Sequence, residues 1–378
     1  MKMLFLLLFW SLWFVNFSTR TVISPILPIL EDEFAISHAL AGGIFTFLSL
    51  GYTATLLLSG LLSPRIGYKR TIIVGFAILT TAVFCFRYTD TYASAVTLSL
   101  FIGLGAGIYL PSAIPLITEI FGRNNWGKVI AFHGTAASLS ILVIPVLTAL
   151  TLRFLQWRAL FFILSAGCLL LLIFFWVLSP DPRPEEKQRA RLSHILRRAD
   201  FWVLAILWIF AVSNGLGLYN VIPLFLVKER GMSLEVGNTI FGLSRIGGVF
   251  SVAIAGFLVD RYGARKILFL VLLMTGFSTI GLALAHIFPL MAVALFVQAT
   301  VSAAFFPVGQ VAISILTSVN ERSTFTGTSI AIGIIIGTGV TPALLGAVAD
   351  AWSFQSGIFF LGVLTALSCV ALKYLQRI

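Results

Sequence analysis

Long apolar runs separated by short polar breaks extend along the whole chain. Each run is close to the roughly 20 residues that a helix needs to cross a hydrocarbon core of ~30 Å. Backbone groups in lipid must find partners within their own segment, so the runs predict helices. The pattern predicts twelve spans, at residues 3–30, 38–63, 71–88, 94–121, 127–152, 157–179, 200–227, 236–259, 266–286, 288–318, 325–350 and 354–374.

Composition and charge support a chain that lies mostly inside a lipid bilayer. Hydrophobic residues make up 59% of it and charged residues 10%, whereas soluble domains are ~25% charged. The net charge of +11 does not indicate a nucleic-acid partner, because the basic residues are scattered over short loops. Most of them fall in loops on the side of the two termini. The positive-inside rule therefore predicts a multi-pass protein of a cytoplasmic (inner) membrane with both termini cytoplasmic.

The second half of the chain repeats features of the first half. The segment "SPRIGYKR" at 63–70 matches "VDRYGARK" at 259–266, so that Gly67 and Gly263 are 196 residues apart. The longest polar segment follows the sixth span, between the two repeats. We therefore expect an N-terminal six-helix bundle at 1–179, a cytoplasmic linker at 180–199 and a C-terminal bundle at 200–378. In such a repeat architecture a substrate site lies near the membrane midplane.

The segment "GFLVDRYGARK" at 256–266 closely matches the motif G-x-L-x-D-R-x-G-R-K. On this motif and the repeat, the chain resembles the major facilitator superfamily over nearly its whole length. The first-half counterpart, "GLLSPRIGYKR" at 60–70, has Pro64 where the family has Asp. The resemblance implies an all-α fold of twelve transmembrane helices in two pseudo-symmetric halves and transport by alternating access. It also implies that the motif residues control conformation instead of binding substrate; they are Gly256, Asp260, Arg261, Gly263, Arg265, Gly67 and Arg65.

Two arginines fall inside predicted spans, where an ionisable group costs ~2.5–3.5 kcal/mol and usually faces the protein interior. Arg20 lies ten residues before the end of its span at Leu30, which is ~15 Å deep at 1.5 Å per residue. Arg245 lies at nearly the same depth in the eighth span, and the sequence places no carboxylate at this level. Two unpaired cations predict a clamp for an anion. Backbone carbonyls around Arg20, and a gating role for Arg245, are the alternatives.

The surroundings of Arg20 add a second resemblance. Arg20 stands eight residues before Pro28 in "RTVISPILP", as in the first span of organophosphate antiporters and anion:cation symporters, where the arginine binds the anionic group. Arg245 resembles an eighth-span arginine of oxalate, monocarboxylate and nitrate carriers, although those arginines lie closer to the loop-motif Asp. These resemblances imply a small organic anion as substrate, with a carboxylate favoured. The antiporters' second arginine, in the seventh span, has no counterpart here.

Other polar side chains within the spans could complete a binding site or carry protons. Ser213 and Gly215 indicate a loosened helix in the seventh span. His133 titrates near neutral pH and is a proton-coupling candidate, with a satisfied core histidine as the alternative. Glu119 is a second candidate, with pairing to Arg65 or Arg70 as its alternative. The donors expected to contact substrate are Asn214, Tyr219, Asn220, Tyr109, Gln298 and Gln310.

Several chemical signals are missing from the sequence. It has no phosphate-cradling loop, catalytic cluster or metal-ligand spacing, so we expect no enzyme, no ATP-driven pump, no cofactor and no metal. We predict a monomeric secondary transporter of a small organic anion. Proton or cation symport is favoured because an inward-negative potential opposes anion uptake at ~2.3 kcal/mol per charge per 100 mV. The alternatives are an exporter of amphipathic, drug-like or lipidic compounds and a non-transporting membrane scaffold.

Overall fold

The computed structural model describes residues 2–122, 125–180 and 192–375. Over these residues the regular structure is entirely helical. In the same part of the chain, twelve helical stretches are long and apolar enough to cross a membrane, which confirms the number of spans that the sequence predicts. The predicted linker at 180–199 falls largely outside the described residues.

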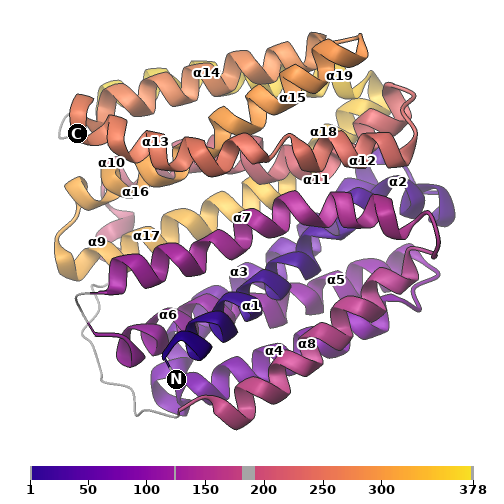
Figure 1. Cartoon of the computed structure of the whole chain (residues 1–378). Coiled ribbons are helices and arrows are strands. Elements are labelled where there is room, and N and C mark those ends of the chain that lie inside the picture. Colours follow the sequence, from indigo (N-terminus) through magenta and orange to yellow (C-terminus); the bar gives the residue numbers. More distant parts are fainter. Residues whose placement is uncertain (1, 123–124, 181–191, 376–378) are drawn as a thin grey trace. The chain divides into compact units, whose positions relative to one another are not determined.

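The helices group into two compact units, and unit 1 comprises Met1–Ile36 and Ile44–Glu186. Within it α1 packs along α7 and α8, while α4 packs along α5 and α8 (Figure 1, indigo to magenta). The helices are α1 (Lys2–Thr21), α2 (Ile23–Phe34), α3 (His38–Ile66), α4 (Tyr68–Phe86), α5 (Tyr92–Gly107), α6 (Tyr109–Ile120), α7 (Trp126–Thr151) and α8 (Arg158–Leu178).

Unit 2 comprises Ser37–Gly43 and Lys187–Ile378. Its α14 packs along α15 and α19, and three π-helical segments interrupt its spans. The helices are α9 (Leu192–Leu196), α10 (Ala199–Val212), α11 (Leu218–Leu224), α12 (Leu234–Leu243), α13 (Ile246–Tyr262), α14 (Ala264–Leu284), α15 (Phe288–Ala303), α16 (Phe305–Leu316), α17 (Val319–Gly333), α18 (Thr341–Ala351) and α19 (Phe354–Ser368). The π-helices are Ser213–Gly217, Phe225–Glu229 and Ile334–Val340, and a 3₁₀ helix follows at Cys369–Tyr374.

The internal repeat is present in the backbone. The starts of α4, α5 and α6 are each followed 196 residues later by the starts of α14, α15 and α16. Gly67 has φ 95° and ψ 139°, and Gly263 has φ 86° and ψ 151°. This region is accessible almost only to glycine, which explains why both repeats have glycine at the tight turn between their second and third spans. The two pseudo-symmetric halves of the predicted fold class are thus confirmed.

A pair of glutamates at the same offset joins the first span to the sixth in each half. Glu33, at the end of α2, accepts a hydrogen bond of 2.5 Å from Nη2 of Arg158 at the start of α8. Glu229 accepts hydrogen bonds from the backbone N–H groups of Phe354 and Gln355 at the start of α19. The partners differ, but each glutamate fixes the same pair of spans. The first spans, which carry several of the predicted site residues, are therefore held at one end.

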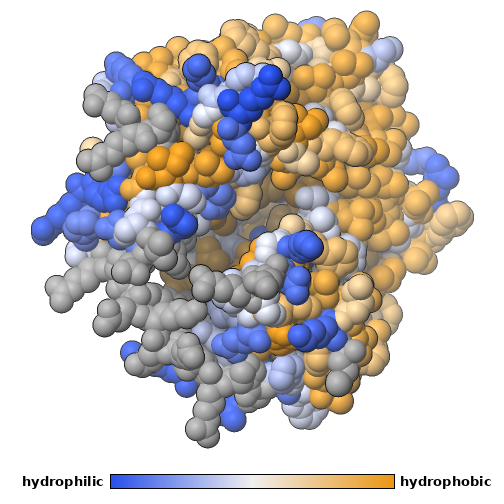
Figure 2. Space-filling view, turned by 60° about the vertical axis from the view of Figure 1, so that its left-hand side comes forward, coloured by the Kyte–Doolittle hydropathy of each residue, from blue (hydrophilic) through white to orange (hydrophobic). Residues whose placement is uncertain are grey.

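The surface of the molecule divides by polarity. Figure 2 shows hydrophilic side chains gathered on the left of the view, while hydrophobic side chains cover the right-hand flank. Many large apolar side chains are exposed, among them Phe250, Phe257 and Phe277, each more than 60% exposed. Large apolar patches that water would not tolerate fit a lipid-facing surface. We therefore expect the exposed phenylalanines to face lipid, and they do not by themselves indicate an apolar substrate.

Candidate functional site

Arg20 and Arg245 both lie where a span changes from one helix to the next. Helix α1 ends at Thr21 and α2 begins at Ile23. Pro25 causes this break, because a proline has no N–H to bond to the carbonyl four residues earlier, which is that of Thr21. At Arg245 the backbone N–H bonds to the carbonyl of Gly242, three residues back, at 3.0 Å. At each break one helix ends and the next begins beside the arginine, so the opposite partial charges of the two helix ends meet there.

Aromatic rings surround the guanidinium group of Arg20 within unit 1. Its Cζ lies 4.4 Å from the ring centres of both Phe17 and Tyr52 and 5.6 Å from that of Trp13. Each contact of this kind contributes ~0.5–2 kcal/mol, whereas leaving a buried charge without its counter-ion costs ~3–5 kcal/mol. The rings therefore hold the guanidinium in place and offset part of its desolvation, but they do not replace an anion.

One edge of the Arg20 guanidinium has no partner. Nε and Nη2 are buried, and no described residue hydrogen-bonds to either atom. These two nitrogens form the side edge of the group, whose parallel N–H bonds match the two oxygens of a carboxylate. Arg20 thus presents a preformed bidentate donor.

Tyr109 and His133, two of the predicted site residues, lie next to this group. The rings of Trp13, Tyr109 and His133 contact one another at centre distances of 5.5 to 5.9 Å. The Tyr109 hydroxyl donates to the carbonyl of Phe9 at 2.8 Å and lies 3.1 Å from Nε2 of His133. Because the hydroxyl hydrogen is used on Phe9, Nε2 of His133 carries a hydrogen and donates it to Tyr109. Trp13 connects this pair to Arg20.

Arg245 has the same kind of environment within unit 2. Its Cζ lies 4.9 Å from the ring centre of Tyr219 and 5.2 Å from that of Phe241. Only 8% of the residue is exposed, and Nε and Nη2 are again buried without a hydrogen-bond partner among the described residues. Tyr219, predicted to contact substrate, therefore contacts the arginine through its ring. The two arginines share one local chemistry in separate units.

Asn214 and Gln298 form one polar network in unit 2. Asn214 lies in the π-helix Ser213–Gly217, where the sequence predicts a loosened helix. Its amide donates to the hydroxyl of Thr365 at 2.7 Å and accepts from that of Thr279 at 2.8 Å. Gln298 donates to the backbone carbonyl of Asn214 at 3.1 Å, and its own Oε1 is buried without a partner among the described residues. Both polar atoms of the Asn214 side chain are therefore hydrogen-bonded within the network. Oε1 of Gln298 is the acceptor that remains available to a ligand.

The remaining predicted site residues do not take part in the contacts described above. Asn220 donates to the backbone carbonyl of Thr338 at 3.2 Å, and Gln310 is partly buried in α16. Glu119 is exposed near the end of α6, so its pairing with Arg65 or Arg70 stays a prediction. Of the motif residues, Gly67 is buried and Gly256 partly buried; Arg65, Asp260, Arg261, Gly263 and Arg265 are exposed.

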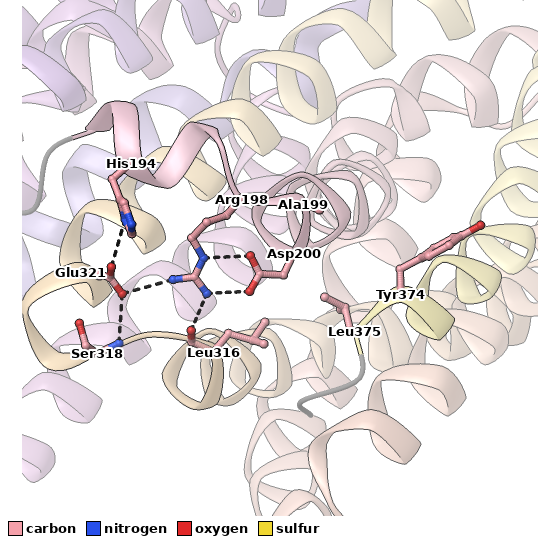
Figure 3. A pocket seen from close by; sticks show the side chains of 9 residues that line it. All are labelled: His194, Arg198, Ala199, Asp200, Leu316, Ser318, Glu321, Tyr374 and Leu375. Carbon is pink, nitrogen blue, oxygen red and sulfur yellow. Dashed lines mark hydrogen bonds and ion pairs between the residues drawn. The ribbon is translucent and has the colours of Figure 1, made fainter.

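A cavity of about 720 Å³ in unit 2 is lined by Arg198 and Asp200. In this pair the Nε and Nη2 edge of the arginine binds a carboxylate. Figure 3 shows Arg198 pointing at Asp200, with Nε 3.0 Å from Oδ1 and Nη2 2.6 Å from Oδ2. This bond raises the pKa of Arg198. Nη1 of the same residue contacts Glu321 at 3.2 Å, and His194 contacts that glutamate at 3.3 Å. These ion pairs join α9 and α10 to the start of α17, so the charged residues that line the cavity have a structural role.

Sequence reasoning missed several residues around the two arginines. Trp13 and Phe17 precede Arg20 by seven and three residues, the spacing of one helix face, so their contact with its guanidinium was open to prediction. Asn16, four residues before Arg20, has the same helical spacing. Tyr52 comes from α3, and no spacing rule connects it to α1. For Arg245 the missed neighbour is Phe241, four residues earlier on α12, which the same helical spacing would have found.

Comparison with known proteins identifies the family. The model of the Major Facilitator Superfamily matches residues 9–255 and 217–377, and the chain belongs to this family. It is therefore a multi-pass membrane protein of a family of transporters, and not an enzyme. Among solved structures, a bacterial homologue of the human lysosomal transporter Spinster, in an inward-facing and occupied conformation, is 16% identical. The superposition covers 98% of this chain and 96% of the homologue's chain with a TM-score of 0.86, which shows that the two proteins share a fold.

Among curated relatives, the uncharacterized MFS-type transporter YceJ of Bacillus subtilis (strain 168) is 30% identical over 185 residues, which are 47% of this chain and 46% of that protein. The chain thus matches less than half the length of this relative. The 3-(3-hydroxy-phenyl)propionate transporter of Escherichia coli (strain K12) is 28% identical, covering 80% of this chain and 76% of its own. The putative niacin/nicotinamide transporter NiaP of Bacillus subtilis (strain 168) is 23% identical, covering 95% and 92%.

Proposed function

We propose that the protein is a secondary transporter of a small organic anion, with a carboxylate favoured, that works by alternating access in a cytoplasmic membrane. Arg20 and Arg245 supply the positive charge that holds the anionic group. The observation that carries this proposal is that Nε and Nη2 of each arginine are buried and have no hydrogen-bond partner among the described residues. A charge in a membrane span is expensive and is retained where function requires it.

The side edge favours a carboxylate over other anions. Its two N–H bonds are parallel and lie in one plane, as do the two oxygens of a carboxylate. Arg198 and Asp200 form this pairing elsewhere in the chain. Two relatives are named for carboxylates, one for 3-(3-hydroxy-phenyl)propionate and one for niacin together with the neutral amide nicotinamide, which supports the same substrate class. Both termini on the cytoplasmic side and coupling to protons or another cation complete the proposal, with His133 and Glu119 as the coupling candidates.

A thermal-shift screen on the purified protein tests the proposal. The panel contains mono-, di- and tricarboxylates, phosphate esters and inorganic anions. We expect carboxylates to raise the melting temperature of the wild type and to have no effect on Arg20→Gln or Arg245→Gln. Arg87→Gln is the matched control, because Arg87 also lies over aromatic rings, those of Tyr88 and Phe162 at 4.9 and 5.1 Å, but outside the spans. Equal carboxylate shifts in wild type and both site variants would overturn the proposal. Stabilisation by apolar amphiphiles alone would favour the exporter.

A further inference from the structure

We propose that the site around Arg20 selects a carboxylate that also carries a hydrogen-bond donor, with the side-chain oxygen of Asn16 as the acceptor for that donor. The inference rests on the proposed function and specifies its substrate further. The donor on the substrate is an O–H or N–H group that reaches Asn16 while the carboxylate lies on the Arg20 guanidinium.

Asn16 is an unusual residue in the first span. None of its surface is exposed. Its Nδ2 donates to the backbone carbonyl of Ala106 in α5 at 3.2 Å, which fixes the orientation of the amide. The opposite atom, Oδ1, is buried and has no hydrogen-bond partner among the described residues. Buried polar atoms are nearly always paired, so this free acceptor requires an explanation.

The position of Asn16 relative to Arg20 explains why its side-chain oxygen is left without a partner. Residues four apart lie on the same face of a helix, and their Cα atoms are ~6 Å apart along the axis. The guanidinium lies over the rings of Phe17 and Trp13, so the Arg20 side chain extends back toward the start of α1, the usual direction for a long helical side chain. It therefore approaches the level of Asn16. A free acceptor and a free donor edge lie on one helix face.

The two groups do not satisfy each other. Oδ1 of Asn16 and both Nε and Nη2 of Arg20 remain unbonded, and a single direct hydrogen bond from one of these nitrogens to Oδ1 would still leave the other nitrogen without an acceptor. A ligand that offers two acceptor oxygens and one donor hydrogen would satisfy all three atoms at once. The rings of Trp13, Phe17 and Tyr52 beside the guanidinium also suit a flat substrate body.

Matched aromatic acids test this inference by direct binding to the purified full chain. The probes are benzoate, 3-hydroxybenzoate and 3-methoxybenzoate, since the methoxy group keeps the oxygen but removes the donor hydrogen. One neutral hydrogen bond corresponds to roughly 3- to 10-fold in affinity. We expect the wild type to bind 3-hydroxybenzoate more tightly than the other two acids by this factor. We expect Asn16→Leu to bind all three with similar affinity.

Ser99→Ala is the control, because Ser99 is equally buried in unit 1 with an unpartnered hydroxyl but lies on α5. It should keep the preference for the hydroxylated acid. Asn16→Ala replaces Asn16→Leu if the larger side chain prevents folding. A wild type without the preference, or an Asn16 variant that keeps it, would overturn the inference. If carboxylates bind through Arg20 without any such preference, the proposed function stands and only the inference fails; if Arg20→Gln and Arg245→Gln both bind carboxylates normally, both fail.

Discussion

The guanidinium carbon of Arg20, on the first span of unit 1, lies 4.4 Å from the ring centre of Tyr52 on the second span. In unit 2 the residues are exchanged: Arg245 is on the second span and Tyr219 on the first, 4.9 Å apart. The arginines do not occupy equivalent positions of the repeat, because 196 residues after Arg20 the chain has Leu216. Each half thus holds an arginine on a tyrosine ring by a different arrangement of the same two spans.

Replacing each arginine by lysine separates charge from shape. Lysine keeps the positive charge but has no planar pair of N–H groups. We expect Arg20→Lys and Arg245→Lys to weaken carboxylate binding by at least ~10-fold, because a charge-assisted hydrogen bond contributes ~1.5–3 kcal/mol. Isothermal titration with the best carboxylate of the thermal-shift panel measures this. Arg87→Lys should bind like the wild type, and unchanged affinity in both site variants would show that charge alone is required.

Asn16→Asp supplies Arg20 with an internal counter-ion. The new carboxylate would have nearly the same size as the amide and would lie on the same helix face as the unpaired cation. We expect the loss of carboxylate binding, because the aspartate would occupy the guanidinium edge, and a change in melting temperature set by the new ion pair against the lost hydrogen bond to Ala106. Differential scanning fluorimetry with and without carboxylate reports both effects. A destabilised variant that still binds carboxylate would show that the two side chains do not meet.

His133→Gln tests proton coupling without removing the hydrogen bond to Tyr109. A glutamine amide can donate to the tyrosine hydroxyl as Nε2 of the histidine does, but it cannot take up a proton near neutral pH. We expect carboxylate binding to persist and the acceleration of uptake by an inward proton gradient to disappear. Uptake into proteoliposomes at several external pH values gives the result. Full acceleration in the variant would remove His133 as the coupling residue.

Substitution of the turn glycines tests whether both repeats have the same backbone conformation at this turn. Gly67 and Gly263 have φ near +90°, and a side chain in such a conformation costs ~1–3 kcal/mol. We expect Gly67→Ala and Gly263→Ala each to lower the melting temperature. The control is Gly281→Ala in α14, where an added Cβ meets no atom within 4 Å and alanine is the better helix former. Equal melting temperatures for all three variants would contradict the assigned turn conformation.

The fold followed from the sequence because run length and the loop motif are properties of neighbouring residues, and the repeat is a match between two such local segments 196 residues apart. Arg20 and Arg245 were also found this way, since any charge within an apolar run is evident. The hydrogen-bond partners of Asn214 could not be found this way, because its amide pairs with Thr279 and Thr365 on two helices that are distant along the chain. Which polar side chains pair with each other depends on how each helix is rotated about its axis. Hydropathy along one chain does not determine that rotation.

Uptake into proteoliposomes tests the central claim most directly. The substrate is the radiolabelled carboxylate with the largest thermal shift, and the proteins are wild type, Arg20→Gln, Arg245→Gln and Arg87→Gln at equal reconstituted amounts. We predict saturable uptake by the wild type and Arg87→Gln, and uptake no greater than that of protein-free liposomes by the other two. Wild-type rates in both Arg20→Gln and Arg245→Gln would contradict the assignment of these arginines as the anion site.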